Sequence, residues 1–303
     1  MIDERFAFGL RIASELELPE LAAAEGAGVA DLTVRIGRCP AVLTGARRVG
    51  TRSQVLPDQL LFEQAGVARY LAHAGSEIVI EPVSGAEPSH IRTFLLGAVL
   101  AGVCYQRGLT PLHANAIAPD GRAIAFTGPS GSGKSTLGGY LAAAGHPVLA
   151  DDVCVLGHGP DGRIVAWPGV RRLKLWRDTL TALGHSADRL DRVVGDRDKY
   201  VVPLTPADLG PTPFARLYVL ERAEAGAPGG ISQLAGAAAM QALTTGVYRL
   251  DLGAAMGRRE AVFAQAVAVL RQASVYRFER RWGLDELPAE ARRLQRHFQA
   301  PPP

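Results

Sequence analysis

The sequence predicts an α/β (α+β) protein with a mixed sheet and flanking helices, preceded by a small β-rich N-terminal region. Two observations carry this prediction. A short apolar run at 123–127, a glycine-rich stretch and a helical apolar pattern give strand, loop and helix in succession. Before residue 84, apolar and polar residues alternate as they do in strands. The turn-forming stretch Ser84–Pro88 separates the two patterns, so we expect a β-rich region at 1–88 and a second domain at 89–303.

The N-terminal region carries no residues with catalytic spacing, and its pattern indicates a small sheet with a structural role. Glycine and proline punctuate the alternating runs. The predicted strands are Phe6–Ile12, Asp31–Ile36, Gln59–Glu63, Val67–Leu71 and Glu77–Glu81.

The second domain mixes helical and strand patterns. Its predicted helices are 89–107, 136–144, 178–183, 235–244, 258–272 and 288–297. Its predicted strands are 112–118, 123–127, 147–156, 164–167, 200–204, 215–221 and 274–278. The turn Pro119–Arg122 joins the first two strands into a hairpin, and the charged run Asp188–Lys199 reads as a loop.

Composition excludes several classes of protein. With 303 residues, 48% of them hydrophobic, the chain can bury a large core, and a net charge of +3 with scattered basic residues does not favour nucleic acid as a partner. Cys39, Cys104 and Cys154 are odd in number and lack metal-ligand spacing, which indicates free thiols in a reducing compartment. The acidic N-terminus is not typical of a signal peptide, and the most apolar helix is too short for a membrane span. We therefore expect a cytoplasmic protein without a membrane partner.

The glycine-rich stretch has the sequence of a phosphate-binding P-loop. Gly128 to Ser135 reads G-x-x-x-x-G-K-S between a strand and a helix. Backbone N–H groups and the positive end of the helix dipole would face an anion, and the glycines allow close approach. Lys134 would reach the β- and γ-phosphates, and the Ser135 hydroxyl would coordinate Mg²⁺. The expected nucleotide-binding residues are Gly128, Pro129, Ser130, Gly131, Ser132, Gly133, Lys134, Ser135 and Thr136.

Two adjacent carboxylates, Asp151 and Asp152, follow the apolar residues of the next predicted strand. Charge inside a strand is costly without a partner, and a carboxylate in this position after a P-loop helix is typical of a Mg²⁺-binding second motif. A solvent-facing pair at a strand end is the alternative. Because neighbours in a strand point to opposite faces, the sequence leaves open which aspartate does what.

Together these motifs resemble the catalytic core of the HPr kinase/phosphorylase family. The shared features are His113, the loop at Gly128–Ser135 and the stretch Gly145–Asp152, in the order in which that family carries them. Segments around them, such as Pro111–Ala114 and Leu217–Glu221, resemble even more the HPr-kinase-like proteins of peptide-modification gene clusters, including kinases of lasso-peptide precursors. The resemblance spans about residues 90–280 and implies a P-loop kinase core of the HPr kinase C-terminal-domain type.

Two departures point away from the HPr enzymes themselves and toward these smaller relatives. Thr136 stands where the bacterial HPr enzymes usually carry Glu, and their glycine- and arginine-rich C-terminal motif is missing from the sequence.

The resemblance implies a serine kinase that uses ATP and Mg²⁺ and acts on a peptide or small protein, plausibly a lasso-peptide precursor. In that interpretation Lys134 and the loop bind the phosphates, Ser135 and Asp152 bind Mg²⁺, and Asp151 is the base. His113 would contact a phosphate or the aspartates, with a packed strand histidine as the alternative. The family also allows a homo-oligomer. Weaker candidates for phosphate or substrate contacts are Arg171, Arg172, Lys174 and Arg249.

Three alternatives remain open from the sequence. The protein could hydrolyse nucleotide as a regulator, bind nucleotide as a structural member of a modification complex, or act as an HPr-type bifunctional kinase/phosphorylase.

Overall fold

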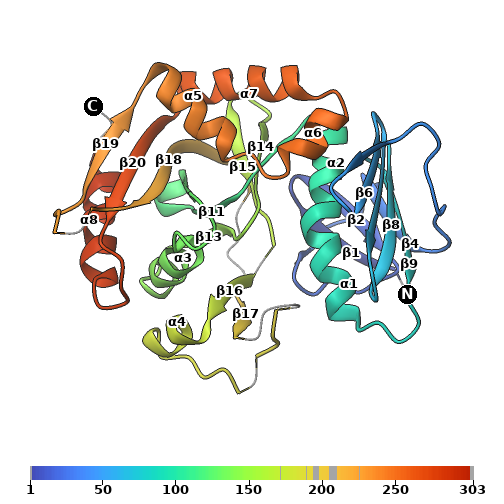
Figure 1. Cartoon of the computed structure of the whole chain (residues 1–303), viewed down its shortest axis with the longest axis horizontal. Coiled ribbons are helices and arrows are strands. Elements are labelled where there is room, and N and C mark those ends of the chain that lie inside the picture. Colours follow the sequence, from blue (N-terminus) through green and yellow to red (C-terminus); the bar gives the residue numbers. More distant parts are fainter. Residues whose placement is uncertain are drawn as a thin grey trace. The chain divides into compact units, whose positions relative to one another are not determined.

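The computed structural model describes residues 2–170, 172–188, 190–193, 198–204, 210–224 and 226–300. The predicted contact residue Arg171 and part of the predicted loop Asp188–Lys199 lie outside them. The chain forms two compact units, Met1–Pro111 with Val247–Ala264 and Leu112–Gly246 with Gln265–Pro303. The chain as a whole is the mixture of helices and strands that the sequence predicts, and each unit contains both (Figure 1). Among the described residues, no helix has the length and apolar character that crossing a membrane requires.

The first unit contains a nine-stranded mixed sheet. Its strand order is β3-β1-β2-β4-β9-β8-β7-β6-β5, with parallel pairing of β2 with β4 and of β4 with β9. The strands are β1 (Asp3–Ala7), β2 (Leu10–Ser14), β3 (Ala22–Ala23), β4 (Leu32–Ile36), β5 (Arg47–Val49), β6 (Ser53–Leu56), β7 (Gln59–Gln64), β8 (Ala68–His73) and β9 (Glu77–Pro82).

The predicted strand Phe6–Ile12 is wrong, because a tight turn divides it. Phe8 and Gly9 both have positive φ angles, 56° and 77°, so β1 and β2 form a hairpin. Alternation continues through the turn in the sequence, and the pattern alone therefore cannot show the reversal.

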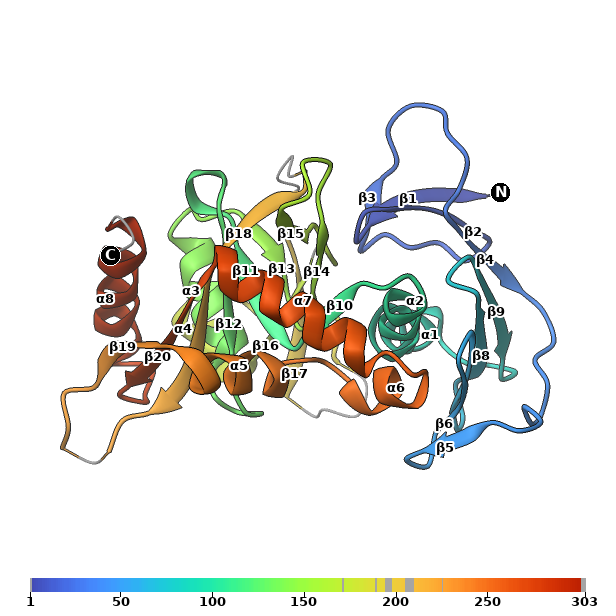
Figure 2. The ribbon, with the colours of Figure 1, turned by 90° about the horizontal axis from the view of Figure 1, so that it is seen from above.

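The helical segment that follows belongs to this first unit. It comprises α1 (Pro88–Phe94), the π-helical turn η1 (Leu95–Val99) and α2 (Leu100–Gln106), and Figure 2 shows α1 and α2 nearly end-on beside the sheet. Tyr70 Oη in β8 donates to Ile91 O at 2.9 Å, and Gly102 packs against Leu60 in β7. Because this helix packs on the N-terminal sheet, the first compact unit extends to Pro111, whereas the division predicted from the sequence lies at residue 88. A short helix that was not predicted, α6 (Leu250–Ala255), also belongs to this unit.

The second unit is built on a mixed sheet with the order β14-β15-β18-β12-β11-β13, in which β20 pairs with β18 and β19 with β20. β12 runs parallel to β18 and antiparallel to β11, which confirms the predicted hairpin. A separate ribbon joins β16 to β17. β10 (Thr110–Leu112) spans the division between the two units in the sequence. The strands of the second unit are β11 (Ala114–Ile117), β12 (Ala123–Thr127), β13 (Val148–Ala150), β14 (Cys154–His158), β15 (Ile164–Trp167), β16 (Arg172–Trp176), β17 (Lys199–Pro203), β18 (Thr212–Arg222), β19 (Gly230–Leu234) and β20 (Ser274–Arg280).

Helices cover both faces of this sheet. Phe126, Leu220 and Phe278 share one apolar core with Leu137 of α3 and Leu294 of α8. Neighbouring residues in β18 and β20 point the other way, toward α5. The remaining elements are the 3-10 turn η2 (Pro119–Gly121), α3 (Lys134–Ala143), α4 (Arg177–Ala182), α5 (Gly236–Thr245), α7 (Arg259–Gln272) and α8 (Leu287–Gln299).

The predicted strand 147–156 is wrong, because the structure divides it into two strands at the aspartates. β13 ends at Ala150, the chain bends at Asp151 and Asp152, and β14 begins at Cys154 beside a different strand. Asp152 has a φ of 70°, a left-handed conformation that is rare for residues other than glycine. The carboxylates therefore lie in a bend and not within a strand.

Candidate functional site

The glycine-rich loop at 128–133 connects β12 to the N-terminus of α3. Gly128, Gly131 and Gly133 all have positive φ angles, and a Cβ on Gly128 would lie 2.8 Å from Leu220 O. A Cβ on Gly133 would collide with the guanidinium of Arg280, which donates to Ser132 O at 2.7 Å. The loop conformation thus requires its glycines. The buried Arg280 of β20 stabilises the loop through its hydrogen bond to Ser132.

Lys134 opens α3 and folds back over the loop. Its Nζ donates to Gly128 O at 2.9 Å and to Pro129 O at 3.2 Å. The residue is 8% exposed, and burial lowers the pKa of its ammonium group, although Asp152 opposes that shift. An incoming anion would offer this buried cation a charged partner in place of two neutral carbonyls.

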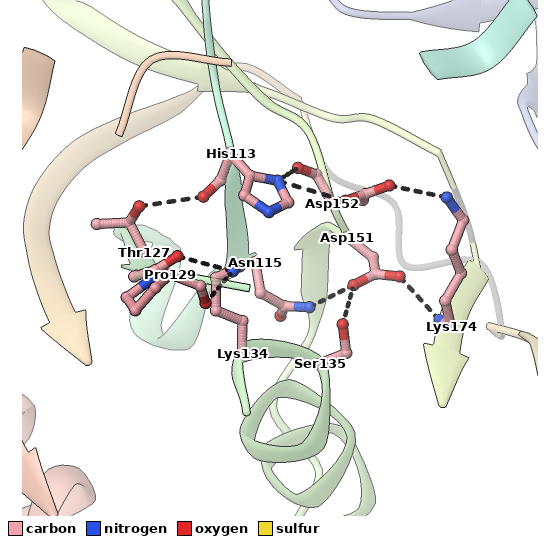
Figure 3. A network of polar contacts seen from close by, with 10 residues as sticks. His113, Asn115, Thr127, Pro129, Lys134, Ser135, Asp151, Asp152 and Lys174 are labelled. Carbon is pink, nitrogen blue, oxygen red and sulfur yellow. Dashed lines mark hydrogen bonds and ion pairs between the residues drawn. The ribbon is translucent and has the colours of Figure 1, made fainter. Parts of the chain in front are cut away.

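Asp151 is the most buried acid of the site. Its Oδ1 accepts from Asn115 Nδ2 at 2.7 Å and from Ser135 Oγ at 3.2 Å, and its Oδ2 accepts from the Lys174 backbone N–H at 2.9 Å (Figure 3). The strand order explains these contacts, because β11 lies between β12 and β13 and brings Asn115 to the end of β13. Burial, with the neighbouring Asp152 charge, raises the pKa of Asp151 to about 6.

Asp152 also contacts Lys174, through its ammonium group, and lies beside His113. Its Oδ2 accepts from Lys174 Nζ at 2.8 Å, and its Oδ1 lies 3.4 Å from His113 Nδ1. His113 Nδ1 is also 3.0 Å from the Asp152 backbone oxygen (Figure 3). Burial of Asp152 opposes ionisation, but the Lys174 ammonium outweighs it and holds the pKa at about 2. Burial, with Lys134, lowers the pKa of His113, so the ring is neutral at pH 7.

These groups line a polar cavity of about 250 Å³, which we call the phosphate cavity. It brings together predicted residues from the loop, from the Asp-Asp bend, from β16 and, with His113, from the position just before β11. Its lining comprises His113, Asn115, Ser130, Gly131, Gly133, Lys134, Ser135, Thr136, Asp151, Asp152, Lys174, Trp176 and Lys199.

Other predicted contact residues lie elsewhere. Arg172 is buried at the start of β16 and does not line the cavity. Arg249 belongs to the other unit, where it pairs with Asp251 at 3.3 Å. Arg171 lies outside the described residues. Lys174, the fourth weak candidate, contacts both aspartates.

Sequence reasoning missed several residues of the site. Asn115 stands two positions after His113, and in the predicted strand 112–118 this spacing would place both on one face and could have indicated the role of Asn115. Trp176 and Lys199 are paired across β16 and β17, and Arg280 comes from β20. No sequence pattern connects these three with the loop, because separate strands deliver them.

A second, larger cavity of about 700 Å³ adjoins the first, and we call it the α5 cavity. It shares His113 and Ser130 with the phosphate cavity. Its lining comprises His113, Thr127, Gly128, Pro129, Ser130, Val219, Glu221, Leu234, Ala238, Gln241, Ala242, Thr245, Gly246 and Arg277.

The donor set of the phosphate cavity fits a magnesium ion that is bound together with phosphates. The described residues contain no group of three or more His, Cys, Asp or Glu placed to hold a metal by themselves. Mg²⁺ commonly takes one or two protein carboxylates and completes its shell with phosphates and water. Ser135 Oγ and Asp151 Oδ1 are 3.2 Å apart, so one ion could contact both. The prediction paired Ser135 with Asp152, but in the structure Ser135 contacts Asp151.

Comparisons with solved structures find likenesses to this chain, whereas the other comparisons find none. No family model and no curated protein matches the chain. Among solved structures, the HPr(Ser) kinase/phosphatase from Coxiella burnetii matches with a TM-score of 0.32 and 12% identity, covering 62% of this chain and 96% of that one. A match at this level leaves the fold and the site to be argued from the chain's own geometry.

Proposed function

We propose that the protein is an ATP-dependent phosphotransferase that transfers the γ-phosphate to a hydroxyl group, a serine of a peptide or small protein. One observation carries the proposal. A loop with its lysine and serine at a helix N-terminus faces two carboxylates, of which Asp151 accepts from the Ser135 hydroxyl and Asp152 accepts from the Lys174 ammonium. Phosphoryl transfer requires this combination of phosphate cradle, metal ligands and a second carboxylate.

The phosphates would be bound by the loop N–H groups and Lys134. Magnesium would be held by Ser135 and Asp151 and would neutralise charge on the bound phosphates. Three hydrogen bonds to Asp151 fix the orientation of its carboxylate, and Asn115 contributes the shortest of them. This assignment exchanges the two aspartates relative to the prediction from the sequence.

Asp152 would accept the proton of the acceptor hydroxyl. In the reaction the bond between the γ-phosphorus and the bridging oxygen breaks, a bond from the acceptor oxygen to that phosphorus forms, and ADP leaves. Because the transition state is loose, the hydroxyl loses its proton late, and a carboxylate of low pKa suffices. Lys174 and His113 hold Asp152 in position, at 2.8 Å and 3.4 Å from its carboxylate oxygens.

Purified protein, labelled ATP and a serine-containing precursor peptide of the lasso-peptide type test the proposal. Label in the peptide supports the kinase. Release of inorganic phosphate alone would support a nucleotide-hydrolysing regulator, and binding without turnover would support a structural role; either result contradicts the proposal. HPr offered as a second acceptor tests the bifunctional alternative, with return of its phosphate to inorganic phosphate as the readout.

A further inference from the structure

The α5 cavity has a wall that differs in chemistry from the phosphate cavity. Val219 of β18, Leu234 of β19 and the alanines of α5 present apolar surface to it. Among the described lining residues, Glu221 and Arg277 carry charge, and they pair with each other at 3.3 Å. A charged ligand would therefore find few partners in this cavity. Its volume of about 700 Å³ can hold one or two large side chains.

The glycine-rich loop divides its residues between the two cavities. Gly128 and Pro129 line the α5 cavity, whereas Gly131 and the residues from Gly133 to Thr136 line the phosphate cavity. An aromatic side chain, Trp176, lines the phosphate cavity together with Thr136 and is 46% exposed. A base stacks favourably on such a ring, so the nucleoside has a partner on that side. The α5 cavity is then left for the acceptor.

The two cavities meet at His113 and Ser130, close to the carboxylate that would take the acceptor proton. His113 Nδ1 is 3.4 Å from Asp152 Oδ1. A hydroxyl placed at this junction would therefore have the α5 cavity directly beside it, and the residue next to the hydroxyl in the acceptor chain would enter that cavity.

We propose that the α5 cavity binds an apolar side chain adjacent to the phosphorylated hydroxyl and so selects acceptor peptides whose serine has a large apolar neighbour. This inference rests on the proposed function, of which it specifies the substrate class. Burying an apolar side chain there gains hydrophobic free energy, whereas a carboxylate would lose its hydration against Val219 and Leu234.

Two serine peptides that differ only in Leu or Glu beside the serine provide the test. Wild-type protein should phosphorylate the Leu peptide with a kcat/KM about tenfold or more above that of the Glu peptide. Ala242→Phe, which fills the cavity from α5, should lower kcat/KM for the Leu peptide about tenfold and leave the Kd for ATP within about twofold. Ala237→Phe is the matched control, because Ala237 is exposed on the same helix and does not line the cavity, and it should change neither value.

A second variant, which enlarges the cavity, tests the inference even if Ala242→Phe fails to fold. Leu234→Ala should shift the preference from Leu toward Trp beside the serine. Phosphorylation of both peptides at equal rates would overturn the inference and leave the kinase proposal standing. Weaker ATP binding in Ala242→Phe, with peptide use unchanged, would assign the cavity to the nucleoside and also overturn it. Transfer to neither peptide, nor to any other serine peptide, would instead remove the proposed function.

Discussion

The phosphate cavity and the α5 cavity share two lining residues, but the first is lined mainly by charged and polar groups and the second has a largely apolar wall. The first gathers three ammonium groups, two carboxylates and the N-terminus of α3 in about 250 Å³. The second is nearly three times larger and is walled by strands and alanines, with its one acid and one arginine paired together. His113 lines both cavities, and most of the charged side chains around it line the phosphate cavity.

Under the proposed function, this difference in lining explains how adjoining cavities hold two unlike substrates, a nucleoside triphosphate and a peptide. A triphosphate needs cations and preorganised donors, whereas a peptide acceptor gains most from apolar contact near its reacting group. Changes on the polar side should then affect nucleotide binding or transfer, and changes on the apolar side should affect the choice of acceptor. The following predictions test that division, from the largest expected effect to the smallest.

Replacing Lys134 should have the largest effect. Lys134→Ala removes the buried ammonium that faces the loop carbonyls, so kcat/KM for phosphoryl transfer should fall at least about a thousandfold. ATP affinity, measured by calorimetry, should fall with it. Arg163→Ala, at an exposed turn, is the control and should match wild type. Retained transfer in Lys134→Ala would show that the loop is not the phosphate cradle.

Asp152→Asn should separate chemistry from binding. Transfer should fall by about 10²–10³-fold, because the amide cannot accept the hydroxyl proton, while the Kd for ATP stays within about threefold. Single-turnover kinetics and calorimetry measure the two quantities. The exposed Asp161→Asn is the matched control. If Asp152→Asn kept full transfer, the proton would have to go elsewhere, and Asp151 would regain the role that the sequence first suggested.

Asp151 should leave a signature in the stability of the metal-free, nucleotide-free protein. Its ordinary pKa is 3.8 and its folded pKa about 6, so between these values the folded protein binds more protons than the unfolded chain. Its contribution to the free energy of unfolding therefore falls as the pH rises from about 4 to about 6, by up to about 3 kcal/mol, or about a hundredfold in the folding equilibrium.

Urea unfolding at a series of pH values measures this effect. Asp151→Asn has no titrating group at this position. Its free energy of unfolding should therefore rise relative to that of wild type as the pH increases from about 4 to about 6. A constant offset between the two is also expected, because the amide places a donor near the Lys174 N–H or Asn115. His113 titrates in both proteins and cancels. Parallel curves would show that the folded pKa of Asp151 is not raised above its ordinary value.

Trp176→Ala should have the smallest effect. Loss of a stacking surface for the base should weaken ATP binding about tenfold, while the KM for the peptide stays unchanged. Fluorescence or calorimetric titration with ATP measures the change. Phe263→Ala, another exposed aromatic residue, is the control. An altered peptide KM with normal ATP affinity would place the acceptor, not the nucleoside, beside Trp176 and would reverse the division of the two cavities.

Much of the site could be predicted because it is local in sequence. The loop, its lysine and its serine are consecutive residues, and the strand and helix around them follow from apolar periodicity. The predicted hairpin of β11 and β12 is confirmed, and it explains why His113 lies near the loop. The boundary at residue 88 could not be judged in this way, because what assigns a helix to a unit is the surface that it buries.

The partners of Asp151 and Asp152 could not be predicted. A regular strand would have sent the two side chains to opposite faces, but the positive φ of Asp152 places the pair in a bend. Asn115, Lys174 and Arg280 reach the site from three different strands. Such contacts depend on the order of strands in the sheet, and periodicity within one segment carries no information about that order.

The sequence by itself thus determined the phosphate-binding motif, the neighbouring aspartates and the upstream histidine, because short-range chemistry and spacing define them. Tertiary structure alone decided which aspartate lies beside Ser135, which arginine supports the loop, and that an apolar cavity begins where the polar one ends. The physical reason is that a motif fixes the residues available to a site, whereas their distances, burial and pKa values arise only when separate strands are packed against one another.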